Sequence, residues 1–269
     1  MATVALCSIC AMDRSLAEAA ALAARCGADG LELTGRAPHL APEADLDEVR
    51  AAGERVRAAG VGVTAYGSYL SYRTPGYQVD AVREVRRAAE LGTKLLRVWA
   101  GHPEGASDDV RDDVVALLRA AGDAAAADGI TVVVERHGGT LADTAARSEA
   151  LLAAVDRANV CLNYQPLDGL APEEVATQPD DARRLAPRSR YFHVKNYRAN
   201  PEAGGPLLLG GDLEGGVLAY PEIFAAAVGA GYRGPYGIEF VAFDDRPLEA
   251  KVAGGVEWLR CALEAVGAP

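Results

Sequence analysis

Eight short runs of β-forming residues recur along the chain at intervals of about thirty residues. Several of them are apolar at consecutive positions, which is typical of parallel strands that helices cover on the outside. Helix-like segments separate the runs, and this alternation predicts right-handed βαβ units and a parallel sheet. The predicted strands are residues 4–10, 30–35, 60–67, 95–101, 130–137, 159–165, 190–196 and 236–243.

The predicted helices are residues 15–27, 45–60, 77–91, 107–128, 141–158, 221–232 and 248–267. Ser15 and Ser107 stand where N-caps are expected, and Gly27 and Gly92 where helices should end. Residues 171–187 are less favourable for a helix because three prolines interrupt them.

Eight strand–helix units in 269 residues fit a closed (β/α)8 TIM barrel, which needs about 250 residues. A doubly wound open sheet would instead carry a glycine-rich loop between its first strand and first helix. That connection reads AMDRSLAEAA here and contains no GxGxxG. We therefore predict a single α/β barrel domain over residues 1–269, with the glycine-rich segment 197–217 as a long irregular loop at its mouth.

The composition argues against two classes of partner. Lys and Arg number 27 against 38 Asp and Glu, and the net charge of −11 argues against nucleic acid or an anionic membrane as partner. The N-terminus lacks the basic region of a signal peptide, and no apolar run is long enough to span a bilayer. Five cysteines in a chain of this length suit a reducing cytoplasm. Cys7 and Cys10 form one CxxC without a second, and in a regular strand they would face opposite sides, so we expect no zinc or redox site there.

The last four predicted strands carry metal-ligand residue types near their C-terminal ends. Glu135 stands in VVVERH, Gln165 in LNYQP, His193 in YFHVKN and Glu239 in GIEF. In a closed barrel these strand ends converge on one mouth, so the four side chains together predict a divalent-metal site. Imidazole with carboxylates suits Mn²⁺, Co²⁺, Zn²⁺ or Mg²⁺, and the absence of thiolate argues against a structural zinc. Taken singly, His193 also fits a hydrogen-bonded core histidine and Gln165 a hydrogen-bonded loop amide, with Asp168 as a substitute ligand.

Two further residues share faces with these candidates. His137 lies two positions beyond Glu135, and Lys195 two positions beyond His193. Both are expected near the reacting atoms, where Lys195 would orient or polarise a substrate oxygen. The competing interpretation of Lys195 is a solvated charge at a strand end.

Other residues carry weaker signals. Glu32 on the second strand is expected to reach the mouth or to support the ligands from behind. Tyr66 and Trp99 fit stacking on a sugar face, although core packing is the more frequent role of both residue types. His39 lies in a proline-rich loop and is assigned no function.

Several segments resemble the xylose isomerase-like TIM-barrel superfamily of sugar phosphate isomerases and epimerases, whose members include ketose 3-epimerases, hydroxypyruvate isomerase and inosose dehydratase. The segments are CGADGLEL, AAGVGVTAYG, VVVERHGGTLADT, YFHVKN, AYPEIFAAAVGAGYRGPYGIEF and VEWLRCALE. The resemblance spans nearly the whole chain and is most specific between residues 220 and 240. It implies that Glu135, Gln165, His193 and Glu239 are the metal ligands, and that the two glutamates also serve as acid and base. Relatives commonly have Asp where Gln165 stands, so with both glutamates ionised this chain would offer a charge of −2 to the ion.

The expected activity is a divalent-metal-dependent isomerase or epimerase acting on a keto-sugar or related polyol through an enediolate. Mn²⁺ is the first expectation for the metal, with Mg²⁺, Co²⁺ or Zn²⁺ as alternatives, and it would act as Lewis acid and template. A glutamate would remove the proton α to the carbonyl, and His137 or Lys195 would help to hold the enediolate.

Three alternatives remain. A dehydratase or other lyase acting on a keto-polyol or keto-glycoside shares the first proton abstraction. A barrel without catalysis would serve as a binding or partner subunit. DNA repair of the endonuclease IV type is disfavoured by the four histidines and the negative charge. The expected partner is a small sugar or polyol, and homo-oligomer formation stays open.

Overall fold

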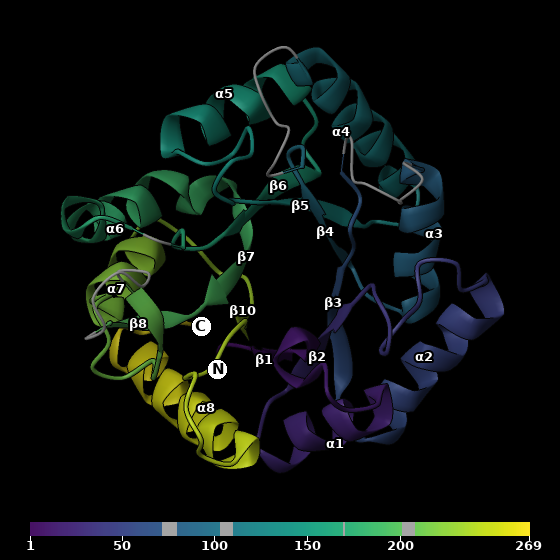
Figure 1. Ribbon diagram of the computed structural model, residues 1–269. Coiled ribbons are helices and arrows are strands. Elements are labelled where there is room, and N and C mark those ends of the chain that lie inside the picture. Colours follow the sequence, from purple (N-terminus) through teal and green to yellow (C-terminus); the bar gives the residue numbers. More distant parts are fainter. Residues whose placement is uncertain (72–79, 103–109, 169, 201–207) are drawn as a thin grey trace.

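The computed structural model describes residues 1–71, 80–102, 110–168, 170–200 and 208–269. Eight parallel strands close into a barrel in the order β1-β10-β7-β6-β5-β4-β3-β2 (Figure 1). They are β1 Val4–Cys7, β2 Gly30–Thr34, β3 Gly62–Gly67, β4 Leu95–Trp99, β5 Thr131–Glu135, β6 Val160–Tyr164, β7 Ser189–Val194 and β10 Tyr236–Ile238. The prediction of a (β/α)8 TIM barrel is confirmed.

Helices surround the barrel on its outside, as Figure 1 shows. They are α1 Leu16–Arg25, α2 Leu46–Ala58, α3 Ala81–Leu91, α4 Arg111–Ala126, α5 Ala145–Val155, α6 Pro172–Leu185, α7 Tyr220–Gly229 and α8 Leu248–Ala265. Ser15 caps α1 as predicted, in a capping box with Glu18 that satisfies backbone N–H groups at the helix start. Gly92 ends α3 in the left-handed conformation, at φ 79°, which only glycine adopts without strain. The predicted N-cap Ser107 lies outside the described residues.

Two segments differ from what the sequence favoured. Residues 172–185 form the continuous helix α6 although Pro179 lies inside it, because Gln178, Ala182 and Leu185 bury one of its faces and this packing outweighs the lost backbone hydrogen bond. The segment after β7 is not simply irregular, since β8 Asn196–Ala199 and β9 Leu208–Gly211 pair in an antiparallel hairpin.

The first strand is also shorter than predicted. Residues 8–11 leave the sheet as a 3-10 helix, η1, so Cys10 does not lie on a strand. All five cysteines are free thiols. Among the described residues, no helix is both long enough and apolar enough to cross a membrane.

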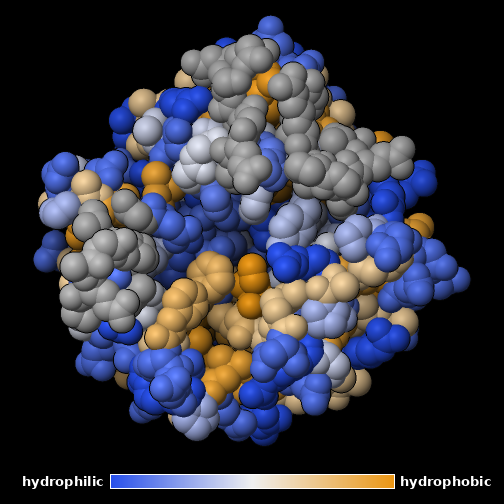
Figure 2. Space-filling view, in the orientation of Figure 1, coloured by the Kyte–Doolittle hydropathy of each residue, from blue (hydrophilic) through white to orange (hydrophobic). Residues whose placement is uncertain are grey.

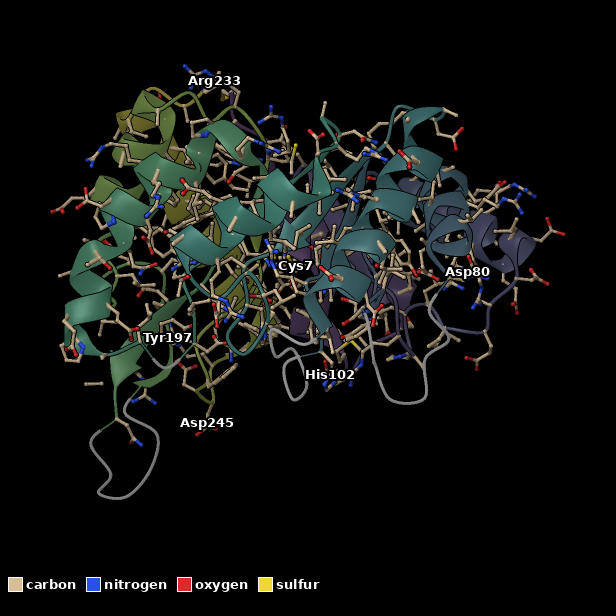
Figure 3. All side chains as sticks on the ribbon, turned by 90° about the horizontal axis from the view of Figure 1, so that it is seen from above. Cys7, Asp80, His102, Tyr197, Arg233 and Asp245 are labelled. Carbon is tan, nitrogen blue, oxygen red and sulfur yellow. The ribbon has the colours of Figure 1, made fainter. Side chains whose placement is uncertain are left out.

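Loops that follow the strands gather at one end of the barrel. In the side view of Figure 3, His102 after β4, Tyr197 in β8 and Asp245 after β10 all lie on one side, and Arg233, which precedes β10, lies on the other. We call the end with His102, Tyr197 and Asp245 the mouth. Figure 2 views this end and shows hydrophilic residues around a hollow at its centre, with a hydrophobic area beside it.

Candidate metal and active site

Side-chain alternation along the strands delivers the candidate residues to the barrel interior. Val133, Cys161 and Tyr191 belong to a small buried cluster that is separate from the large core between strands and helices. Glu135 and His193 lie two residues beyond Val133 and Tyr191, so they face the same interior one layer nearer the mouth. Glu135 and His193 therefore lie on the interior face and toward the mouth, as predicted.

The four predicted ligands meet at this layer. The amide of Gln165 donates to Glu135 Oε1 at 3.0 Å, and its Oε1 lies 3.1 Å from His193 Nδ1. Glu239 Oε1 lies 3.6 Å from the same Nδ1. Glu135, His193 and Glu239 each offer a ligand atom within 4.8 Å of the other two, and all four residues are buried.

The environment of His193 fits a cation better than a neutral hydrogen-bond network. Its Nε2 lies 2.6 Å from Glu32 Oε2, which can only accept, so the Nε2 proton is donated there. Nδ1 lies 3.1 Å from the Asn163 amide nitrogen and also faces the oxygens of Gln165 and Glu239. Asn163 Oδ1 has no hydrogen-bond partner although it is buried. An imidazole nitrogen surrounded by oxygen acceptors is a donor set for a divalent metal.

Lys195 is fully enclosed rather than solvated. Its Nζ lies 2.9 Å from Glu239 Oε2 and 3.0 Å from Asp168 Oδ1, and the residue is 1% exposed. The interpretation of Lys195 as a solvated surface charge is therefore wrong. Burial alone would lower the pKa of Lys195, but the two carboxylates outweigh burial and raise it. Asp168 also accepts from the Tyr197 hydroxyl, so it is oriented toward Lys195 and Tyr197.

Arg97 is a site residue that the sequence analysis missed. Its Nη1 lies 3.0 Å from Glu135 Oε2, and its Nε lies 3.5 Å from Glu32 Oε1. Trp99 donates its indole N–H to the same Glu135 oxygen at 3.0 Å. A signal was present, because Arg97 is a cation in the apolar strand LLRVW and shares the face of Trp99.

Electrostatic interactions keep Glu32 and Glu135 ionised despite their burial. Burial alone would raise the pKa of Glu32, but His193 and Arg97 outweigh it and lower the pKa to about 2. Burial acts in the same sense on Glu135, where Arg97 is the largest opposing cause and the pKa is again lowered. Burial by itself would lower the pKa of His193, yet Glu32 and Glu239 raise it.

The aromatic residues divide into one near the site and one in the core. The Trp99 ring stacks on His137 with centroids 5.0 Å apart, and His137 Nδ1 lies 2.8 Å from the Gly138 carbonyl. His137 therefore borders the site through Trp99. Tyr66 is buried and donates to Glu84 at 2.7 Å, so of its two interpretations core packing is the correct one.

The two cysteines of the CxxC have different partners. The thiol of Cys7 lies 3.3 Å from Glu32 Oε2, below the ligand set. The Cys10 thiol donates to the Glu239 carbonyl at 2.9 Å. Burial raises the pKa of both thiols, and nearby carboxylates add to the shift.

Comparison with known proteins agrees with this architecture. The profile of the xylose isomerase-like TIM barrel family matches residues 20–261. A search of curated protein sequences finds no match.

Solved structures share the fold at low sequence identity. A xylose isomerase-like TIM barrel protein from Mycobacterium smegmatis in complex with magnesium has a TM-score of 0.78 and 18% identity, covering 100% of this chain and 98% of its own. The probable 3-DHS dehydratase from Bacillus anthracis has a TM-score of 0.73 and 21% identity, over 96% and 98%. An L-ribulose 3-epimerase has a TM-score of 0.75 and 17% identity, over 99% and 96%.

Proposed function

Since the chain belongs to the xylose isomerase-like TIM barrel family, we propose that it is a divalent-metal-dependent isomerase or epimerase acting on a keto-sugar or related polyol through an enediolate. The observation that carries the proposal is the meeting of Glu135, Gln165, His193 and Glu239 inside the mouth, with the imidazole Nδ1 facing oxygen atoms. We also propose that residues 1–269 form one domain, that it works in the cytoplasm, and that its partner is a small sugar or polyol.

These four residues would hold the ion, Mn²⁺ first, with Mg²⁺, Co²⁺ or Zn²⁺ as alternatives. A metal held there would supply Lewis-acid polarisation of a substrate carbonyl and a template for a neighbouring hydroxyl. The formal charges around the site support binding of a divalent ion. Four carboxylates and two cationic side chains leave a net charge of −2, which such an ion would balance. The charged residues are Glu32, Glu135, Asp168 and Glu239, opposed by Arg97 and Lys195.

The two glutamates would move the proton α to the carbonyl. Glu135 receives three donors, from Gln165, Arg97 and Trp99, whereas Glu239 is engaged chiefly by Lys195. One glutamate removes the proton and the other returns it, which gives an epimer on the opposite face of the same carbon or an isomer at the neighbouring carbon. Lys195 provides a buried positive charge beside the oxygens on which negative charge develops.

The first experiment is metal quantitation of the purified protein, followed by a screen in D2O over ketoses, inososes and keto-glycosides. Deuterium uptake next to the carbonyl without loss of water supports an isomerase or epimerase. A conjugated enone as product would assign the same first step to a lyase. A protein that binds no divalent metal and stays inactive with added Mn²⁺ would refute the proposal and favour a binding subunit.

Substitution then tests the proton-transfer role. Glu239→Gln and Glu135→Gln should each abolish exchange while circular dichroism stays native. Glu84→Gln is a matched control, since Glu84 is an equally buried carboxylate that accepts from Tyr66 and lies beside Arg87, away from the ligand set. Full exchange in either site variant contradicts the assignment.

A further inference from the structure

Glu32 lies directly behind the proposed ligand set. Its Oε2 receives His193 Nε2 at 2.6 Å and the Cys7 thiol at 3.3 Å, and its Oε1 lies 3.5 Å from Arg97 Nε. The carboxylate is 2% exposed. Glu32 is thus the only carboxylate within hydrogen-bond distance of His193 Nε2 in the described part of the chain.

This contact determines which ring nitrogen of His193 is free to bind a metal. Because an ionised carboxylate only accepts, Nε2 carries a proton, and Nδ1 is the only ring nitrogen that a metal could bind. Nδ1 is the nitrogen that faces Gln165 and Glu239. The Tyr191 ring packs edge-on against the imidazole, with centroids 5.1 Å apart at 74°, and further restricts its plane.

A glycine on β3 leaves the space that the side chains of Glu32 and Arg97 occupy. A Cβ added at Gly67 would lie 2.5 Å from Glu32 Oε1 and 2.9 Å from Arg97 Nη2. Gly67 and Arg97 are register partners on β3 and β4, so glycine at this strand end provides the space that the two charged side chains occupy. The arrangement is therefore built into the sheet as well as into the two side chains.

We propose that Glu32 is a positioning residue that holds His193 in the Nε2–H tautomer, with Nδ1 directed at the metal, and thereby sets the affinity of the site for a divalent cation. The inference rests on the proposed function but assigns a role that the ligand set alone does not contain. Carboxylates behind a metal-bound histidine contribute ten- to a hundredfold to affinity in other sites, by orienting the ring and increasing its basicity.

A second metal held by Cys7, Glu32 and His193 is a competing interpretation, because their ligand atoms also lie within 4.8 Å of one another. Two observations favour a hydrogen-bonded support instead. The 2.6 Å separation of Glu32 and His193 is that of two atoms sharing a proton, and Arg97 places a positive charge beside the same carboxylate.

The test measures Mn²⁺ affinity by the EPR signal of the free ion, in wild type, Glu32→Gln and Glu84→Gln. Glu32→Gln should raise the dissociation constant ten- to a hundredfold, at about 1.4 kcal/mol per decade. Glu84→Gln removes a buried carboxylate of similar surroundings that does not touch His193, and should stay within about twofold of wild type.

A second readout observes the protonated ring nitrogen of His193 directly. In the Zn²⁺-loaded wild-type protein, ¹⁵N-edited spectra of the histidine rings should show His193 protonated at Nε2, with a downfield proton from its short hydrogen bond. The resonance is assigned by its loss in His193→Asn, and it should move upfield in Glu32→Gln while Glu84→Gln leaves it in place. A proton on Nδ1, or equal Mn²⁺ affinity in wild type and Glu32→Gln, overturns the inference.

Failure of the proposed function would look different. A barrel that is not a metalloenzyme would leave wild type without measurable Mn²⁺ binding. Failure of the positioning role leaves wild-type binding intact and equal in the variant.

Discussion

Gln165→Glu is the most direct test of whether this amide contacts the metal. Glutamate keeps the length of glutamine and replaces its NH2 group by an oxygen. In the structure that group donates to Glu135 Oε1 at 3.0 Å. The substitution therefore converts a hydrogen bond into a contact between two carboxylates, inside a site where Gln165 is 1% exposed.

Without metal, the variant should be less stable than wild type. An uncompensated buried charge costs about 3 kcal/mol. In a chain of this size about 3 kcal/mol corresponds to a melting temperature roughly 5–10 °C lower.

With metal present, the same substitution should be favourable, because the added negative charge attracts the ion. A divalent ion and a carboxylate about 4 Å apart at an effective dielectric of about 20 attract by about 8 kcal/mol. Subtracting about 5 kcal/mol, the upper end of the cost of burying the new charge, leaves about 3 kcal/mol, which is about a hundredfold in affinity. Gln165→Asp restores the residue type common among relatives, and it should tighten binding less because its side chain is one methylene shorter.

Isothermal titration with Mn²⁺ and a competing chelator measures the affinity, and thermal melts with and without chelator measure the stability. Gln178→Glu is the matched control, since Gln178 is an equally buried amide whose oxygen accepts from Arg136 and Tyr164 instead of facing His193. Its Mn²⁺ affinity should stay within about twofold of wild type. Unchanged or weaker binding by Gln165→Glu, with the apo protein destabilised as expected, would show that Gln165 does not coordinate the ion.

Two further predictions concern other residues. His39 is buried with Nε2 donating to backbone carbonyls, and burial lowers its pKa, so its stabilising contribution should be present above about pH 6.5 and be lost as pH falls below that value. Between about pH 7 and 5 the melting temperature should fall more steeply for wild type than for His39→Gln. Parallel slopes of melting temperature against pH would count against this reasoning. The chain has two tryptophans, so Trp258→Phe leaves Trp99 as the only reporter beside Glu135. The fluorescence emission of Trp258→Phe should change on addition of Zn²⁺, whereas that of Trp99→Phe should not. Unchanged emission in Trp258→Phe would mean that Glu135 does not bind the ion.

The barrel was predictable because its signal is periodic. Each β run needs only its own apolar residues and the helix that follows, and eight repeats leave few topologies open. The hairpin of β8 and β9 lacked such a signal, because glycines and prolines surround it and β8 follows β7 after a single residue. Helix α6 was underrated because local proline penalties were visible, whereas the burial of Ala182 and Leu185 that offsets them depends on the rest of the fold.

The residues of the candidate site also differ in whether the sequence alone predicts them. That Glu135, Gln165, His193 and Glu239 lie close together could be predicted, because strand direction and alternation suffice to bring strand ends to one mouth. Arg97 was missed because a cation in a strand is informative only once its neighbours across the sheet are known.

Those neighbours depend on strand register. Cys7 faces Glu32 across β1 and β2, and Trp99 faces Glu135 across β4 and β5. Register shifts interrupt the pairing beside Glu32 on β2 and again on β6, so counting residues from each strand start does not give the partners.

Strand register also affects the charge at the candidate site. The strand ends supply atoms able to bind a cation, whereas the register supplies the charges behind them. Arg97 and Lys195 each lie against one of the two proposed acid–base glutamates, so each carboxylate would bind an ion in competition with a buried cation of the chain itself. Two ligand glutamates without these partners would attract a divalent ion more strongly and would be held more rigidly by it. With them, part of the carboxylate charge is already balanced, and the same cations favour the ionised form of the glutamates, which is the form that would accept a proton from a substrate.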